Sequence, residues 1–366
     1  MPDQTAGEAV ADLAKITGRS GGDAAETAGQ PQGGPLWLAK IPKIDAHAHI
    51  DVEAGTELLC EMLEAENMKW LAVCYDGLQW ETLENRIRLA GKLHAEFPGR
   101  ISWATSFKLN NWGSPAWASE SIDLIADSFE KGAVAVKVWK DIGMALKDPD
   151  DSYVMIDDER FDPVFDFVRS RDKTLVGHVI EPLSCWQPLE SMALNNDREY
   201  YRDHPREHAY RNPGMLKQAR YLESMKLLLE RHPGLRIVLC HLAGLESDLE
   251  ALAGLLDEHS NLAVDTAARV GHLQALDREK VRAFLIKYQD RLLYGTDLEI
   301  AVGDPAETGR KLVQAAGTYE RDRLYFSTDR EITVPELDCP VRGLELPAQV
   351  LQKLYFDNAL HWYPGI

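Results

Sequence analysis

Eight short apolar segments, each followed by a turn and a longer amphipathic stretch, repeat along the chain from Lys43 onward. We expect strands at residues 44–49, 70–75, 101–107, 133–139, 175–178, 237–241, 262–265 and 292–297. Helical patterns lie between them, at residues 80–97, 121–131, 161–169, 215–231, 245–258 and 278–287. Alternation of this kind favours parallel strands, because each helix carries the chain back to the start of the next strand. Eight such units predict an α/β protein with a closed (β/α)8 TIM barrel.

The alternative arrangement is a doubly wound open sheet. Such a sheet normally carries a glycine-rich phosphate turn after its first strand, and the segment after residue 49 has none. We expect one barrel domain over residues 36–366, preceded at residues 1–35 by a leader that is either flexible or strapped to the barrel. The leader lacks the basic start and apolar stretch of a secretory signal.

The charge balance limits the possible partners. The chain of 366 residues has 40 Lys plus Arg against 59 Asp plus Glu, a net charge of −19, which argues against binding to nucleic acid or anionic membranes. No apolar run is long enough to cross a membrane. The five cysteines are odd in number and form no CxxC pair, which argues against a disulfide framework or a thiolate zinc site. We therefore expect a cytoplasmic homo-oligomer that acts on a small molecule.

Residues of the types that ligate metals occur where the predicted strands end. Active groups of a TIM barrel lie at the carboxyl ends of its strands. The candidates at these ends are His47, His49, Lys137, His178, His241 and Asp297. A single buried histidine is more often a core or capping residue than a ligand. His47 and His49, however, are two residues apart in an extended segment, so their side chains point to the same side and can hold one cation.

Several stretches of the sequence resemble the amidohydrolase superfamily, in particular its amidohydrolase-related branch (amidohydrolase 2) of metal-dependent hydrolases and decarboxylases. The resemblance rests on Ile44-Asp45-Ala46-His47-Ala48-His49, Gly177-His178, His241-Leu242-Ala243-Gly244 and Leu293-Tyr294-Gly295-Thr296-Asp297, and it spans residues 44–359. It implies that the catalytic metal is bound by His47, His49, His178 and Asp297. His241 would be either a ligand of a second metal or a polarising partner.

The chemistry of these residues agrees with the resemblance. Neutral imidazoles with a carboxylate suit one Zn²⁺ ion and leave a position open for water. We expect Asp297 to accept the proton of that water and to pass it to the leaving group, while His241 stabilises the developing oxyanion. Cys240 precedes His241 in an alternating strand, so we expect its side chain to face away from the site as part of the core.

The role of Lys137 stays open at this point. In some branches of the superfamily, a lysine at the end of the fourth strand is carboxylated and bridges two metals. Lys137 could equally contact a substrate carboxylate or form a structural ion pair. A single metal is the arrangement that we expect.

Residues in the loops after the strands are candidates for substrate binding. Arg269 follows the seventh strand and could clamp a carboxylate with two hydrogen bonds, or pair with Asp265 or a neighbouring helix. The connection at residues 179–213 is long and aromatic, which is typical of a lid over the barrel mouth. Trp186 and His208 would contact the substrate from this lid. Alternatively, the connection packs at a subunit contact.

Three functions fit this pattern. The first is a metal-dependent hydrolase that cleaves an amide, lactone or ester bond of a small carboxylated molecule. The second is a nonoxidative decarboxylase or a hydratase that uses the same metal and the same aspartate. The third is a noncatalytic protein that contains a metal and only binds its ligand.

Overall fold

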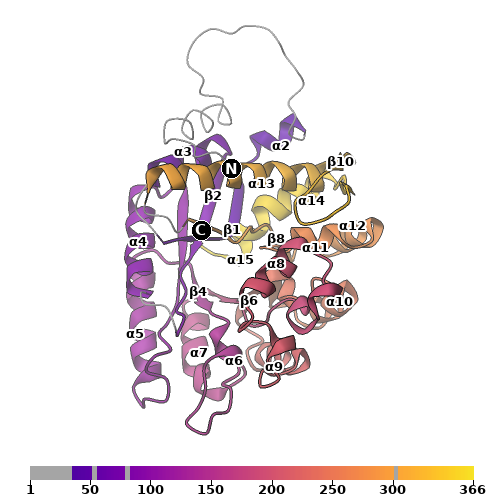
Figure 1. Ribbon diagram of the computed structural model, residues 1–366. Helices are drawn as coiled ribbons and strands as arrows, with labels where there is room; N and C mark the ends of the chain where they lie inside the picture. The colour runs from indigo at the N-terminus through magenta and orange to yellow at the C-terminus, as the bar shows by residue number, and fades with distance from the viewer. Residues whose placement is uncertain (1–34, 52–55, 79–82, 301–303) are drawn as a thin grey trace.

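The computed structural model describes residues 35–51, 56–78, 83–300 and 304–366. Nine parallel strands form one curled sheet in the order β8-β7-β6-β5-β4-β3-β2-β1-β9 (Figure 1). They are β1 (Lys43–Ile50), β2 (Met68–Val73), β3 (Ile101–Thr105), β4 (Ala135–Val138), β5 (Thr174–Gly177), β6 (Arg236–Leu239), β7 (Leu262–Asp265), β8 (Leu292–Leu293) and β9 (Leu298–Ile300). All eight predicted strands are present, and the TIM-barrel prediction is confirmed. The predicted leader lies, apart from Pro35, outside the described residues.

The barrel closes between its last and first strands through a segment that is not itself a strand. β8 has only two residues. After it, the Ala46 N–H donates to the Tyr294 carbonyl at 2.9 Å, and the Asp297 N–H donates to the His47 carbonyl at 2.8 Å. β9 then pairs in parallel with β1. The predicted strand at residues 292–297 is therefore shorter than expected, because Asp297 adopts a positive φ of 64°, which interrupts an extended chain.

Helices cover the outside of the barrel. Those of nine or more residues are α3 (Thr56–Ala65), α4 (Leu83–Glu96), α5 (Trp117–Glu130), α7 (Asp162–Ser170), α8 (Asn195–Asp203), α9 (Gln218–Arg231), α10 (Leu249–Glu258), α12 (Arg278–Lys287) and α13 (Pro305–Ser327). The shorter ones are α2 (Leu36–Lys40), α6 (Asp141–Met144), α11 (Val270–Gln274), α14 (Ala348–Gln352) and α15 (Asn358–Trp362). Each of the six predicted helices is present. The start of the one predicted from residue 80 lies outside the described residues.

α13 was not predicted, although it is the longest helix in the described part of the chain. It lies across one end of the barrel in Figure 1 and packs against α3. Beyond it, the short strands β10 (Glu331–Ile332) and β11 (Val341–Arg342) pair in antiparallel fashion. None of the helices in the described ranges is both long and apolar enough to cross a bilayer.

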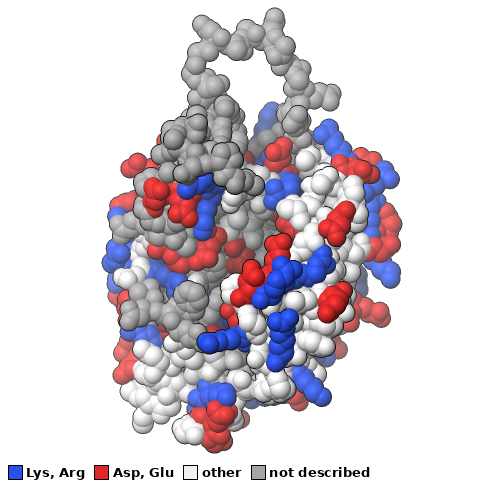
Figure 2. Space-filling model, in the orientation of Figure 1, with Lys and Arg blue, Asp and Glu red and all other residues white. Residues whose placement is uncertain are grey.

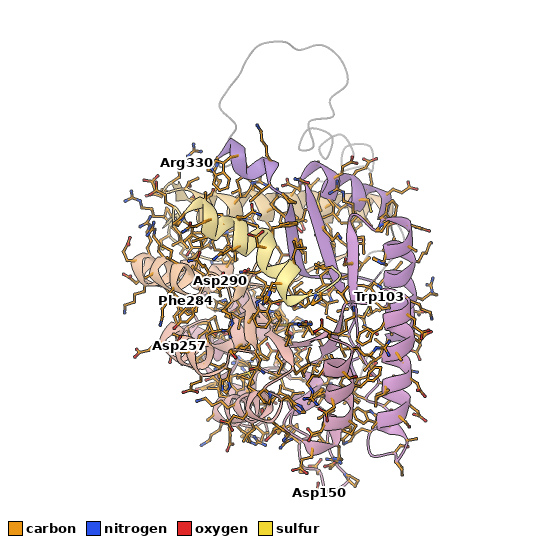
Figure 3. All side chains as sticks on the ribbon, turned by 180° about the vertical axis from the view of Figure 1, so that it is seen from behind. Trp103, Asp150, Asp257, Phe284, Asp290 and Arg330 are labelled. Carbon is orange, nitrogen blue, oxygen red and sulfur yellow. The ribbon has the colours of Figure 1, made fainter. Side chains whose placement is uncertain are left out.

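The core has two layers. Inside the barrel, small and branched side chains from successive strands pack together, and Trp362 and Tyr363 at the C-terminus join them. Between the strands and the helices lies a larger layer. Trp103 on β3 belongs to this outer layer (Figure 3). A Cβ atom on Gly91 of α4 would lie 3.8 Å from its ring, so α4 covers that indole directly. The C-terminal residues thus fill the interior of the barrel.

The surface carries charges of both signs. Figure 2 shows basic and acidic side chains close together on the face in view. The five cysteines are all free thiols, and four of them are buried.

Asp322 of α13 is a buried carboxyl group, and it makes stability depend on pH. Its Oδ2 accepts a hydrogen bond from the Tyr294 hydroxyl at 2.8 Å. Burial raises the pKa of Asp322 to about 7, with Glu336 and Asp45 acting in the same direction and Arg321 in the opposite one. In the unfolded chain the pKa is roughly 3.9, so the unfolded state loses its proton first as the pH rises. Stability is therefore lost between about pH 4 and pH 7, by up to roughly 4 kcal/mol.

Replacing Asp322 by asparagine should remove this loss, because the amide does not titrate and can still accept the Tyr294 hydrogen bond. We expect the variant to melt several degrees above wild type at pH 8 and to lose that advantage near pH 4. Thermal melts at several pH values measure the difference, and Asp123→Asn, an exposed change on α5, is the control. Parallel pH profiles for wild type and Asp322→Asn would contradict the prediction.

Candidate metal centre

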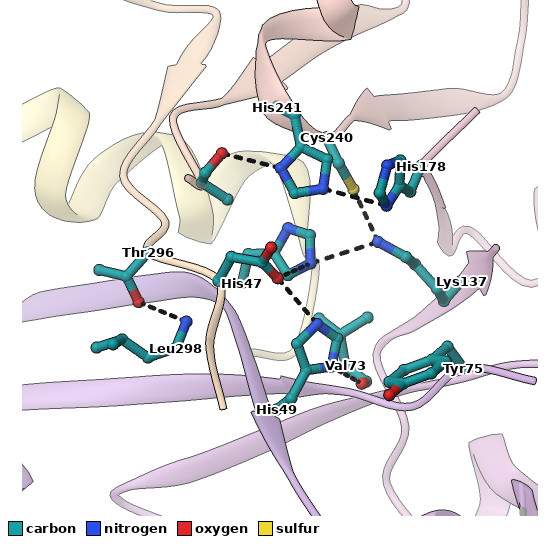
Figure 4. A network of polar contacts seen from close by, with 12 residues as sticks. His47, His49, Val73, Tyr75, Lys137, His178, Cys240, His241, Thr296 and Leu298 are labelled. Atoms are coloured by element: carbon teal, nitrogen blue, oxygen red, sulfur yellow. Dashed lines mark hydrogen bonds and ion pairs between the residues drawn. The ribbon is translucent and has the colours of Figure 1, made fainter. Parts of the chain in front are cut away.

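His47 and His49 reach the barrel interior because β1 is irregular. The pairing of β1 with β2 shifts between Asp45, which faces Trp70, and Ala48, which faces Ala72. Three steps along β1 thus correspond to two along β2, the pattern of a β-bulge. Ala46 packs in the barrel interior, and the bulge turns the next residue, His47, toward the same side. The two histidines then alternate in the ordinary way and converge in Figure 4.

Both imidazoles point one nitrogen at the same carboxylate oxygen. The Nε2 atoms of His47 and His49 lie 3.3 Å and 3.1 Å from Oδ1 of Asp297. The three ligand atoms lie within 4.8 Å of one another, close enough to share a metal ion. The His47 side chain is fully buried, whereas the Asp297 side chain is 31% exposed, so the group is reachable from one side.

The other nitrogen of each imidazole shows which atoms carry protons. Nδ1 of His49 lies 2.8 Å from the Val73 carbonyl, and Nδ1 of His47 lies 2.9 Å from Oδ2 of Asp265. Both partners are acceptors, so both Nδ1 atoms donate, and each neutral ring has a lone pair at Nε2. Two lone pairs therefore face a carboxylate oxygen, an arrangement that a bound cation would make favourable. The residues fit a divalent metal.

The electrostatics lead to the same result. Burial, followed by the charge of Lys137, lowers the pKa of His47 below its usual value and so keeps the ring neutral. Burial disfavours the ionised form of Asp297, yet its histidine neighbours hold the pKa of Asp297 well below the usual range. The Asp297 carboxylate is therefore ionised, as a metal ligand must be.

His241 and His178 extend the group on one side. Nδ1 of His241 donates to the Ala267 carbonyl at 2.8 Å, so its Nε2 is an acceptor, and Nδ1 of His178 lies 3.3 Å from it. Burial lowers the pKa of His241 to about 3. Nε2 of His178 is buried without a hydrogen-bond partner. His178 therefore contacts His241 and is not one of the three ligand atoms that converge.

The backbone around His241 is strained. His241, Leu242 and Ala243 have φ values of 60°, 53° and 57°, and Gly244 continues the left-handed turn at 64°. Such conformations cost free energy for residues other than glycine and are found mainly where function requires them. A Cβ atom on Gly244 would overlap Cγ2 of Ile180, so only glycine fits there.

Cys240 does not face away from the site, and that prediction was wrong. Its sulfur lies 2.9 Å from Nζ of Lys137, inside the barrel, and it can form a ligand group with His47 and His241. The left-handed turn at His241 ends the strand alternation on which the prediction rested. Lys137 is fully buried, and its Nζ also lies 3.4 Å from Nε2 of His47.

The sequence of the second half of the chain is similar to a known family. Residues 212–365 match the model of a family described as amidohydrolase. The match covers less than half of the chain and is therefore a similarity of this segment. The resemblance is thereby confirmed, together with the prediction that the protein is an enzyme of this type. No match was found among curated proteins.

Solved structures share the fold of this barrel. An uncharacterised TIM-barrel protein from Bordetella bronchiseptica is 13% identical, with a TM-score of 0.52 over 89% of this chain and 99% of that one. A dihydroxybenzoic acid decarboxylase from Polaromonas sp. JS666, with bound manganese and 2-nitroresorcinol, is 12% identical, with a TM-score of 0.51 over 88% and 96%. A 2,6-dihydroxybenzoate decarboxylase is 13% identical, with a TM-score of 0.50 over 88% and 99%. At such identities the likeness establishes the fold alone.

Asp265 is a residue of this candidate site that sequence reasoning missed. It ends β7, and its Oδ1 accepts hydrogen bonds from the N–H groups of His241 and Ala267, at 2.7 Å and 3.1 Å. Its Oδ2 orients His47. The signal available in the sequence was its place at a strand end, which we had considered only as an ion-pair partner of Arg269.

Arg269 does not pair with Asp265. It is nearly buried, donates to the Ala268 carbonyl at 3.0 Å, and lies 3.8 Å from a carboxylate oxygen of Glu246, just before α10. Of the two expected ion pairs, the one with a residue beside a neighbouring helix agrees better with the position of Glu246 than the one with Asp265 does. A substrate contact of Arg269 stays a prediction.

The long connection at residues 179–213 is folded rather than free of secondary structure. It contains α8 and the short 3-10 helices η2 (Leu183–Trp186), η3 (Leu189–Ser191) and η4 (Ala209–Arg211), so the next helix begins earlier than expected. Lys140, two residues after β4, binds this connection through Glu181 at 2.6 Å and Glu207 at 3.4 Å. Its role as a lid stays a prediction.

Trp186 and His208 make structural contacts within or beside this connection. Trp186 donates to the Leu216 carbonyl at 3.0 Å, and its ring centroid lies 5.6 Å from that of Tyr221. His208 is fully buried, bonds the Gln187 carbonyl at 2.8 Å through Nε2, and stacks on Tyr201. These contacts give both side chains partners other than a substrate.

Replacing His208 by alanine should therefore destabilise the connection rather than change substrate preference directly. Loss of a buried ring and its hydrogen bond costs about 2–4 kcal/mol. Denaturant unfolding together with limited proteolysis within residues 179–213 measures the effect. His204→Ala, at an exposed site of the same connection, is the control. A His208→Ala protein of wild-type stability with an altered KM would instead support the substrate contact.

Proposed function

We propose that this amidohydrolase is a metal-dependent hydrolase that cleaves an amide, lactone or ester bond of a small, carboxylated molecule. The observation that carries the proposal is the pair of imidazole lone pairs of His47 and His49 directed at Asp297, which is itself open to one side. We propose Zn²⁺ as the ion, because imidazole nitrogens with a carboxylate suit it. The manganese in the decarboxylase from Polaromonas makes Mn²⁺ the second candidate.

A metal ion held by His47, His49 and Asp297 would supply Lewis acidity, polarising a substrate oxygen and easing the deprotonation of water. The free oxygen of Asp297 would accept the proton of the attacking water and return it to the leaving group. Asp265 and the Val73 carbonyl hold the two imidazoles in the tautomer that leaves Nε2 free. The chain thus supplies an oriented ligand set and a proton carrier.

The expected oxyanion role of His241 is revised in this proposal. Its proton lies on Nδ1, which is engaged by the Ala267 carbonyl, so the neutral ring cannot donate from Nε2. We propose that His241 instead accepts a hydrogen bond from His178 or joins the metal as a further ligand. Lys137 lies beside the ligand set, since its Nζ lies 3.4 Å from Nε2 of His47, and we propose it as the partner of a developing negative charge or of a substrate carboxylate.

A second candidate function is nonoxidative decarboxylation. Tyr75 and Trp139 stack with centroids 4.1 Å apart, and their rings meet His49 and His178 edge to face at 5.1 Å and 5.3 Å. A flat aromatic surface beside a metal centre suits an aromatic acid. Two of the solved structures with this fold are decarboxylases of dihydroxybenzoates.

Isotope labelling in product analysis distinguishes the two functions. The metal-loaded enzyme is screened against carboxylated amides, lactones and hydroxybenzoates in ¹⁸O-water and, separately, in D₂O. Hydrolysis places one ¹⁸O atom in the acid product and releases no CO₂. Decarboxylation releases CO₂ and places deuterium on the carbon that lost it. Turnover that persists unchanged in chelated, metal-free protein would contradict both candidates.

A further inference from the structure

A cavity lies beside the chain segment that carries Asp297, yet none of the metal-centre residues lines it. Its volume is about 210 Å³. Its walls come from α11, α13, residues 334–336, the start of α8 and the segment at residues 295–298. Such a volume is below the usual range for drug-sized ligands and suits a smaller organic molecule. The question is which chemistry its walls favour.

Asp322 supplies a carboxylate to this wall, and Arg321 acts on it only from beyond ion-pair distance. It is 6% exposed, and its Oδ2 is engaged by the Tyr294 hydroxyl. In the part of the chain that the structure describes, Oδ1 has no hydrogen-bond partner and no cationic side chain lies within ion-pair distance of the carboxylate. Burial removes water from the carboxylate and so disfavours its ionised form. For this reason the pKa of Asp322 is raised to about 7.

Glu336 lines the same cavity and adds a second acidic group. Its Cβ and Cγ atoms lie 3.3 Å from the position of a Cβ on Gly271, so it packs against the start of α11. Its charge is felt by Asp322, whose pKa it helps to raise. Arg321 also lines the cavity and donates to the Thr318 hydroxyl at 3.1 Å. Two acidic groups and one basic group leave an excess of one negative charge.

The composition of the cavity favours an organic molecule over a bare metal ion. Asp322 and Glu336 belong to no described group of three or more residues whose ligand atoms lie close enough to share an ion. Leu194, Val270 and Val334 contribute apolar surface to the same walls. An occupant with both a cationic nitrogen and an apolar body matches this lining.

We propose that this cavity is a second ligand site, which binds a small organic molecule through a protonated amine placed between Asp322 and Glu336. The apolar part of the molecule would lie against Leu194 and Val270. The proposal does not depend on the reaction at the metal centre, and it is tested by binding alone.

The test compares cyclohexylamine with cyclohexanol, which has nearly the same shape but no charge. Calorimetric titration at pH 8 into the full chain should show binding of the amine at least about tenfold tighter than that of the alcohol. Asp322→Asn should weaken amine binding by about tenfold or more, and Glu336→Gln by a smaller factor. Glu331→Gln, the same kind of change at an exposed residue of β10, should leave it unchanged. Zinc-loaded and metal-free protein should bind the amine equally.

Three results would overturn the proposal. The first is equal affinity for the amine and the alcohol, or no binding of either. The second is unchanged amine affinity in both Asp322→Asn and Glu336→Gln. Two variants are used so that the test still holds if one of them does not fold. The third is amine binding that disappears when zinc is added, because the amine would then occupy the histidine cluster.

Discussion

Replacing Asp297 by asparagine is expected to lower kcat by about 10²-fold or more on any substrate that the enzyme turns over. The amide fills the same space next to His47 and His49, but it cannot accept a proton at neutral pH. It is also a weaker metal ligand than a carboxylate, so metal content must be measured in the same samples. Steady-state kinetics on protein reloaded with excess metal separate the loss of the proton carrier from the loss of the ion.

The matched control is Asp123→Asn, which makes the same chemical change on the exposed surface of α5. It should retain wild-type kcat and metal content. An Asp297→Asn enzyme with full metal content and near-normal kcat would show that another group carries the proton.

Replacing Asp265 by asparagine is expected to weaken metal binding by about 10- to 100-fold, although Asp265 is not a proposed ligand. One of its oxygens accepts from His47, and the other accepts from the N–H groups of His241 and Ala267. An asparagine has a single acceptor oxygen, so its NH₂ group would face an N–H donor. To avoid this contact between two donors, the His47 ring would have to rotate or to move its proton to Nε2. In either case the Nε2 lone pair would no longer face the metal.

Competition between the protein and a chromophoric zinc chelator measures this affinity. Asp197→Asn is the control, because Asp197 bonds Nε2 of His272 at 3.0 Å in a similar buried pair away from the metal centre. It should leave zinc affinity unchanged. Equal affinities for wild type and Asp265→Asn would mean that His47 is held by packing alone.

The sequence allowed the strands and the residues at their ends to be predicted, because both follow from rules that act over a few residues. The apolar runs placed β1 to β8, and the fold then placed His47, His49 and Asp297 near one another. The structure brings these three together. Their metal-binding role stays a prediction.

The wrong or missing predictions concern side chains whose orientation depends on more than the local sequence pattern. Strand alternation predicted that Cys240 and His241 face opposite sides. Cys240 faces inward like Val238, and the left-handed turn at His241 ends the alternation and brings that ring to the same side. Neither the bulge in β1 nor the hydrogen bond between Asp265 and His47 can be predicted from the sequence pattern. His208 is polar and was predicted to contact the substrate, yet its side chain is buried within residues 179–213. Such choices depend on packing between distant segments.

The packing of Trp362 and Tyr363 within the barrel has a consequence for how the enzyme turns over. Because Trp362 and Tyr363 pack among the strand side chains in the lumen, we expect substrate and product to reach Asp297 from the side on which that carboxylate is exposed. Substrate and product would then use the same opening. A product that has not yet departed occupies the path of the next substrate, so product should compete with substrate and raise the apparent KM while leaving kcat unchanged.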